Sequence, residues 1–98
     1  MTFINKRESV IERRSVKMAE ARGWYNVKLE KCNKNGMPDR MFMHQGGLIF
    51  FVEFKTDKGA LSEIQTERIK QLRAMNHKVY VIRSVVEMKG VLDAEEPL

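Results

Sequence analysis

The sequence has very little cysteine and proline, and these shortages exclude several classes of protein. Cys32 is the single cysteine, so neither an intrachain disulfide framework nor a cysteine-based zinc site can form. Two prolines and six glycines are too few for a low-complexity chain, whereas 43% hydrophobic and 32% charged residues are typical of an ordered globular domain. The lone cysteine fits a reducing compartment, and we expect a cytoplasmic protein.

Long hydrophobic runs are also missing. No apolar stretch reaches about 18 residues, and the N-terminus lacks the apolar region of a signal peptide, so we expect neither a membrane span nor secretion. A chain of 98 residues can build one domain with one hydrophobic core, and at this size it gains from a partner subunit. The expectation is a single domain over residues 1–98, with 93–98 as a frayed tail.

Charge of one sign is in modest excess. The 18 Lys and Arg residues outnumber the 13 Asp and Glu residues, which gives a formal net charge of +5. This balance favours an anionic partner such as nucleic acid. Lys and Arg also serve plain solubility, so the charge alone does not decide between these two interpretations.

Hydrophobic periodicity predicts elements in the order αβββαβα. They are helix 5–22, strand 25–29, strand 39–44, strand 48–55, helix 62–75, strand 79–83 and a short helix from residue 84. The run from Leu48 to Val52 is apolar on both faces, which indicates a central strand covered on both sides. The strand, helix, strand succession at 48–83 implies a parallel pair, so the fold class is α/β with a small mixed sheet flanked by helices.

Two carboxylates are predicted to converge at one end of this sheet. Asp39 opens one strand of the central hairpin, and Glu53 lies near the end of its partner strand. Period two places Lys55 on the same face as Glu53, about 7 Å along the strand. Magnesium prefers oxygen ligands, often one or two carboxylates with water and substrate phosphate, so this pair could hold such an ion beside an ammonium group.

A Glu-x-Lys triplet is weak evidence alone, because roughly one occurs by chance in a chain of this composition. Glu87-Met88-Lys89 is a second copy. It falls in a predicted helix with no Pro-Asp shortly before it, so we interpret it as a surface pair. For Glu53 the alternative is an ion pair at a strand end, but burial of that charge would be costly without a functional partner.

Three successive segments carry a resemblance to a known family. They are Gly36-Met37-Pro38-Asp39-Arg40, Phe51-Val52-Glu53-Phe54-Lys55-Thr56 and Leu61-Ser62-Glu63-Ile64-Gln65, and they resemble the motifs of the VRR-NUC (virus-type replication-repair nuclease) family of the PD-(D/E)xK nucleases. The likeness runs from about residue 8 to residue 83. It implies a restriction-endonuclease-like core.

The resemblance also implies roles for single residues. Asp39 and Glu53 would be metal ligands together with the backbone carbonyl of Phe54, and Lys55 would be the catalytic lysine. The family places an acidic residue on the first helix, for which Glu12 is favoured over Glu8, with Glu20 last, and Glu12 would join the metal ligands. It also places a glutamine on the helix after the Glu-x-Lys strand, here Gln65.

Gln65 has a structural alternative, since Ser62-x-x-Gln65 is also a helix capping box. Gln65 shares a helical stripe with apolar residues, and an inward polar group needs a partner, so an active-site role is favoured. Basic residues around the predicted site are candidate phosphate contacts, with a solvated face as an equal alternative. They are Lys28, Lys31, Lys34, Arg40 and Lys58.

The expected function is hydrolysis of DNA phosphodiester bonds with Mg²⁺ or Mn²⁺. Small stand-alone proteins of this kind resemble phage or bacterial homodimers that act on branched DNA in repair or recombination, so the resemblance implies a Holliday-junction resolvase in the cytoplasm of a bacterium or phage-infected host. A two-fold dimer suits a four-way junction. The alternatives are a monomeric flap or nicking nuclease and a non-catalytic DNA-binding module. The retained carboxylates and lysine argue against the binding module.

Overall fold

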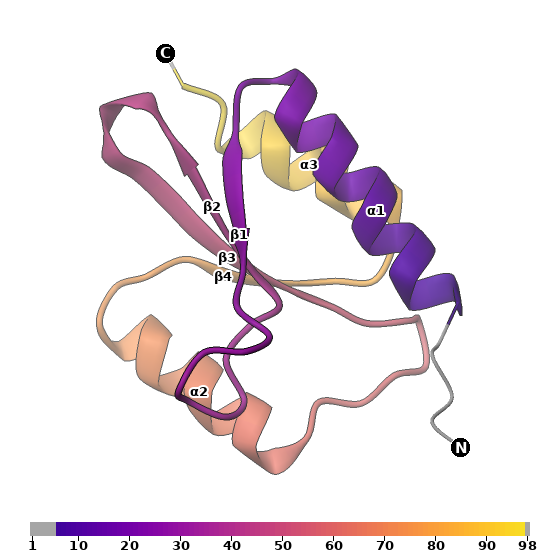
Figure 1. The fold of residues 1–98 in the computed structure, drawn as a ribbon, viewed down its shortest axis with the longest axis vertical. Coiled ribbons are helices and arrows are strands. Elements are labelled where there is room, and N and C mark those ends of the chain that lie inside the picture. Colours follow the sequence, from indigo (N-terminus) through magenta and orange to yellow (C-terminus); the bar gives the residue numbers. More distant parts are fainter. Residues whose placement is uncertain (1–5, 98) are drawn as a thin grey trace.

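The computed structural model describes residues 6–97, which form a four-stranded mixed sheet with helices on both faces (Figure 1). The elements are α1 (Lys6–Ala21), β1 (Tyr25–Lys28), β2 (Arg40–His44), a 3₁₀ turn (Gln45–Gly47), β3 (Leu48–Phe54), α2 (Glu63–Ala74), β4 (Val79–Ile82) and α3 (Val85–Ala94). The strand order is β1-β2-β3-β4, antiparallel except for the parallel pair β3–β4. The predicted αβββαβα order and fold class are confirmed.

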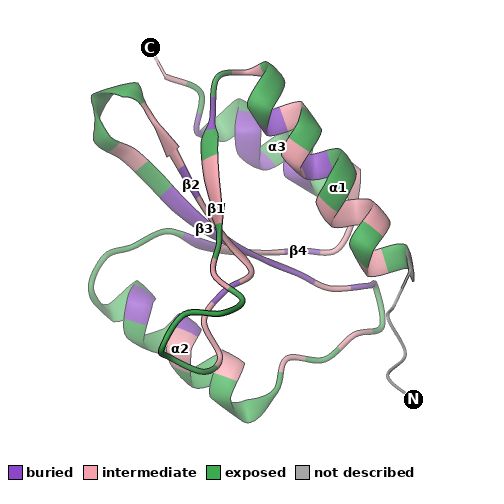
Figure 2. Ribbon diagram, viewed as in Figure 1, coloured by how far each residue is buried: buried purple, intermediate pink, exposed green. Residues whose placement is uncertain are grey.

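β3 is the central strand, and its residues from Phe50 to Phe54 are all buried (Figure 2). Side chains alternate along a strand, so β3 contributes to two cores. Phe50 and Phe54 pack with α1 and α3 on one face. Phe51 packs with Ile69 and Leu72 of α2 on the other face. The predicted two-sided burial of this strand is therefore confirmed.

Serine side chains begin the second and third helices. Ser62 accepts a hydrogen bond from the Gln65 N–H, and Ser84 accepts one from the Glu87 N–H, which satisfies helix N–H groups that have no partner within the helix. The predicted opening of the first helix at Asn5 lies outside the described residues. Among residues 6–97, no helix is both long and apolar enough to cross a membrane.

The C-terminal segment differs from the frayed tail expected at 93–98. α3 continues to Ala94, and Glu95 is buried. The Glu95 carboxylate accepts hydrogen bonds from Lys78 Nζ at 2.7 Å and from the Tyr80 hydroxyl at 2.5 Å. These contacts with the start of β4 hold the end of α3 against the sheet, and residue 98 lies outside the described residues.

Candidate active site

Asp39 and Glu53 meet at one end of the sheet, on the face that α2 covers. Asp39 immediately precedes β2, and Glu53 is the penultimate residue of β3. The Asp39 carboxylate accepts a hydrogen bond from the Phe54 N–H at 2.8 Å, which ties it to the end of β3. The predicted convergence of the two carboxylates is confirmed, whereas their roles stay predictions.

Burial makes both carboxyl groups hard to ionise. The pKa of Glu53 is raised to about 7, mainly by desolvation and also by the negative charge of Asp39. Desolvation also raises the pKa of Asp39 to about 6, although the hydrogen bond from the Phe54 N–H acts in the opposite direction. Two raised carboxyl pKa values at one place are typical of a functional site, since an ordinary fold gains nothing from burying neighbouring acids.

The Glu53 side chain is only 2% exposed, and one of its two oxygens has no protein partner. Oε2 accepts a hydrogen bond from Gln65 Nε2 at 3.0 Å and lies 3.7 Å from Lys55 Nζ. Oε1 is buried without a hydrogen-bond partner. A carboxylate oxygen in that position is costly unless it binds a proton or a cation. The oxygen donors of Glu53 and Asp39 therefore fit a hard divalent ion.

The number of carboxylates is also compatible with magnesium. Among residues 6–97, no three His, Cys, Asp or Glu side chains gather closely enough to form a metal site by themselves. Magnesium does not require such a cage, because it commonly takes one or two carboxylates and completes its octahedron with water and substrate phosphate. Asp39 and Glu53 meet this smaller requirement.

Pro38 explains how the Phe54 carbonyl could also serve as a ligand. Continuing the register of β2 and β3 beyond its last pair places the buried Pro38 opposite Phe54. The Phe54 N–H is occupied by the Asp39 carboxylate. Proline has no N–H, so Pro38 cannot donate the hydrogen bond that another residue would give to the Phe54 carbonyl. The proline therefore leaves the Phe54 carbonyl oxygen, beside the two acids, without a donor at this position.

Gln65 combines the two roles that the sequence presents as alternatives. Its Oε1 accepts a hydrogen bond from the Ser62 N–H at 2.9 Å, which completes the capping box of α2. Its Nε2 donates to Glu53 at 3.0 Å. One amide side chain has both an acceptor and a donor, so the helix cap also fixes one oxygen of Glu53.

The structure separates the two candidate acids of α1. Glu12 forms an ion pair with Arg40, with 2.7 Å between Glu12 Oε2 and Arg40 Nε. The charge of Glu12 raises the pKa of Asp39, whereas the charge of Glu8 raises the pKa of both Asp39 and Glu53. For Asp39 the effect of Glu12 is the larger of the two. Both acids of α1 therefore act on the site, and the assignment of Glu12 stays a prediction.

The five predicted phosphate contacts fall into two groups. Arg40 also donates to Asn26 at 2.7 Å, so its guanidinium is held by two side chains. Lys28 pairs with Glu30 at 3.0 Å on the surface. The remaining three are exposed on loops: Lys31, Lys34 and Lys58.

Arg83 is a site-associated residue that sequence reasoning missed. Its Nη1 donates to the carbonyls of Thr56 at 2.7 Å and Gly59 at 2.6 Å. A Cβ on Gly59 would lie 3.5 Å from Lys55 Cδ, so this braced loop also contacts the lysine stem. The only sequence signal is a basic residue directly after the strand that is parallel to β3.

The second Glu-x-Lys triplet lies in α3, as predicted, and not at the site. Glu87 accepts a hydrogen bond from the Arg83 N–H, and Lys89 pairs with Asp93 at 2.9 Å on the exposed face of the helix. Met88 between them is fully buried in the core. The triplet therefore has a structural explanation.

Comparison with known proteins finds a likeness in three dimensions. No protein-family model and no curated protein matches the sequence. Among solved structures, the chain is similar to one described as a "VRR_NUC domain", with a TM-score of 0.81 and 23% identity, over 89% of this chain and 95% of the other. The chain therefore has the fold of a VRR_NUC domain.

Proposed function

We propose that this chain is a metal-dependent DNA endonuclease of the VRR-NUC family. The observation that carries the proposal is the buried pair Asp39 and Glu53, with one unsatisfied carboxylate oxygen, next to Lys55. The VRR_NUC fold supports it, and the resemblance of the sequence motifs to PD-(D/E)xK nucleases implies two acids and a lysine at these positions. Retention of all three side chains argues against a module that only binds DNA.

Mg²⁺ or Mn²⁺ would be held by Asp39, Glu53 and the Phe54 carbonyl, with an acid of α1 nearby. When bound, such an ion polarises the scissile phosphate and lowers the pKa of a ligand water. Gln65 keeps Glu53 Oε2 fixed and leaves Oε1 for the ion. The Lys55 ammonium, close to Glu53, would orient the attacking water or offset negative charge that develops on the phosphate.

The finer proposal is that the substrate is branched DNA and that the enzyme acts as a homodimer in Holliday-junction resolution, in the cytoplasm of a bacterium or phage-infected host. The net charge of +5 favours a polyanion. A two-fold dimer would present two equivalent sites to a junction of near two-fold symmetry. The short chain also gains stability from a partner subunit.

The test compares cleavage of an end-labelled four-way junction, a 5′ flap and a linear duplex of matched sequence, with and without Mg²⁺. Wild type should cut the junction in paired, metal-dependent incisions, and Asp39→Ala should not. Asp57→Ala is the matched control, because Asp57 is an exposed acid in the nearby loop. No metal-dependent cleavage of any DNA would refute the nuclease. Preferred cutting of the flap by a monomer would refute the resolvase.

A further inference from the structure

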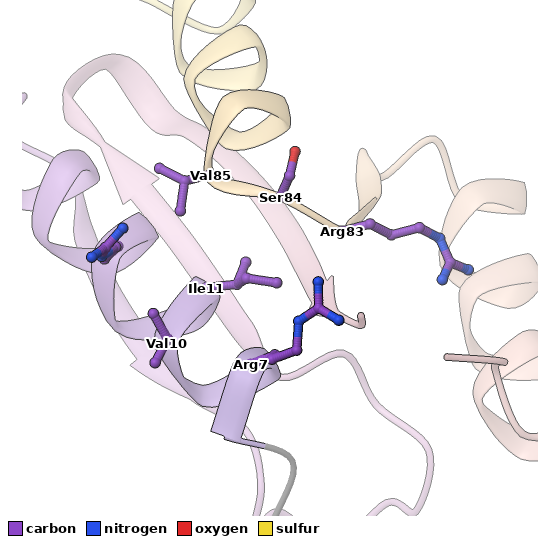
Figure 3. Close-up of a pocket in the computed structure, with 7 residues that line it drawn as sticks. Arg7, Val10, Ile11, Arg83, Ser84 and Val85 are labelled. Carbon is purple, nitrogen blue, oxygen red and sulfur yellow. The ribbon is translucent and has the colours of Figure 1, made fainter. Parts of the chain in front are cut away.

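A cavity of about 410 Å³ lies between the first turns of α1 and the segment that joins β4 to α3 (Figure 3). Val10 and Ile11 of α1 and Val85 of α3 supply an apolar lining, and Arg7 and Arg14 of α1 supply positive charge. This volume falls in the range of small-ligand sites, about 300 to 1,000 Å³. The cavity plays no part in the carboxylate site described above.

The lining selects a ligand that is apolar on one side and anionic on the other. Arg7 and Arg14 are seven residues apart, which puts them two turns apart on the same side of the helix, about 10 Å along its axis. A nucleotide combines a flat base, able to contact valine and isoleucine, with a phosphate, able to contact arginine. In a duplex the base faces are stacked, so only an unpaired nucleotide can offer both groups.

The cavity borders the end of the sheet that carries the candidate site. β3 and β4 are parallel, so their carboxyl ends lie together, and the Lys55 N–H donates to the Ile82 carbonyl at 3.0 Å. Arg83 lines the cavity but directs its guanidinium away from it, toward the loop that follows Lys55 (Figure 3). A DNA strand seated in the cavity would therefore lie at the same end of the sheet as the carboxylates.

We propose that this cavity binds one unpaired nucleotide of the DNA substrate, with its base against Val10, Ile11 and Val85 and its phosphates against Arg7 and Arg14. The proposal rests on the nuclease function and not on the resolvase assignment, because a four-way junction with fully paired arms offers an unpaired nucleotide only where a base pair opens at its branch point. Charge complementarity favours this occupant, because Arg7 and Arg14 adjoin the apolar side chains that line the same cavity.

The experiment measures binding by fluorescence anisotropy in EDTA, so that no cleavage occurs. A duplex with a single-stranded tail, here called the tailed duplex, is compared with the blunt duplex. The variant Arg7→Gln/Arg14→Gln should weaken binding of the tailed duplex about tenfold more than the matched control Arg13→Gln/Lys17→Gln, which removes two charges from the same helix outside the cavity. Both variants should weaken binding of the blunt duplex equally. Equal losses on the tailed duplex would overturn the proposal.

A second variant tests the apolar part of the lining without changing charge. Val10→Gln should lower the preference for the tailed over the blunt duplex while leaving the salt dependence of binding unchanged. Circular dichroism would show that α1 still forms. An unchanged preference would refute contact between the base and the cavity. Metal-dependent cleavage by a wild type that shows no tail preference would refute this proposal and leave the nuclease standing.

Discussion

Glu53 places a carboxyl group near the end of the central strand, where the folded protein solvates its charge poorly. Its two oxygens have different surroundings, since Gln65 and Lys55 are close to one and no side chain satisfies the other. Such a group costs stability in the metal-free protein and persists only where the surrounding packing stabilises the fold. Because burying this carboxyl group lowers stability, its presence at this position points to a functional role.

This cost predicts an unusual pH dependence in the metal-free protein. Burial raises the pKa of Glu53 from 4.5 to about 7 and that of Asp39 from 3.8 to about 6. Between about pH 4 and pH 7 the folded state therefore binds more protons than the unfolded state, so the free energy of unfolding contributed by this pair falls as pH rises. The loss should be on the order of 4 kcal/mol between pH 5 and pH 7.5.

Urea unfolding in EDTA at the two pH values measures this loss. Glu53→Gln, which cannot ionise, should lose clearly less stability than wild type over the same range. Identical losses in the two proteins would show that Glu53 does not titrate with a raised pKa. Adding Mg²⁺ at pH 7.5 should stabilise wild type and leave Glu53→Gln nearly unchanged, since a ligand that binds only the folded state raises stability.

Single residues were predictable where strand periodicity fixes their position. Asp39, Glu53 and Lys55 follow from the hairpin register and from the apolar run that identifies the central strand. The surroundings of Glu12 did not follow, because its ion pair with Arg40 joins residues 28 positions apart and depends on how α1 crosses the sheet. The bracing of the loop by Arg83 was missed for the same reason.

The start of α2 has both a structural and a proposed chemical role. Ser62→Ala removes the serine cap but leaves the Gln65 amide in reach of Glu53, so it should cost about 1 kcal/mol of stability with little change in the cleavage rate. Gln65→Ala removes the contact with Glu53 as well, so it should lower both the stability and the cleavage rate. Chemical unfolding and single-turnover cleavage would show whether the two variants differ in rate. Equal rates would contradict a chemical role for Gln65.

The loop before Asp39 depends on a close contact with α2. Gly36 has a φ of +79°, and a Cβ there would lie 2.8 Å from the Ile64 backbone oxygen. Gly46 has nearly the same φ, +80°, with open space around it. Alanine strains the backbone at both positions, about 1 kcal/mol or more, but only Gly36→Ala also displaces the loop. The midpoint temperature of thermal unfolding of Gly36→Ala should be well below that of Gly46→Ala. The reverse order would contradict the contact.

Element types and order were predictable because apolar periodicity and serine caps mark them directly. Two features of the structure could not be predicted from the sequence. Tyr25 has the period of an inward strand residue, yet it is 68% exposed, because β1 is an edge strand that α2 does not cover there. The end of α3 was expected to fray, since the polar sequence does not reveal that Lys78 and Tyr80 of the distant β4 segment would bind Glu95.

For the whole molecule, we predict a homodimer. Tyr25 and Ile49 lie on one face of the sheet, since each pairs with Met43, and both leave apolar surface exposed that a second copy would cover. Light scattering at micromolar concentration should give twice the 11.5 kDa of the chain, and titration should give two chains per four-way junction. A monomer that still cuts junctions symmetrically would contradict the dimer.

We propose that the Glu53-x-Lys55 triplet beside Asp39 is catalytic and that its copy in α3 is not. The most direct measurement is the single-turnover rate of Mg²⁺-dependent DNA cleavage by Lys55→Met and by Lys89→Met. Loss of the site lysine should lower the rate about 100-fold or more, while loss of the surface lysine should change it by less than about twofold. Equal rates for the two variants would contradict the claim.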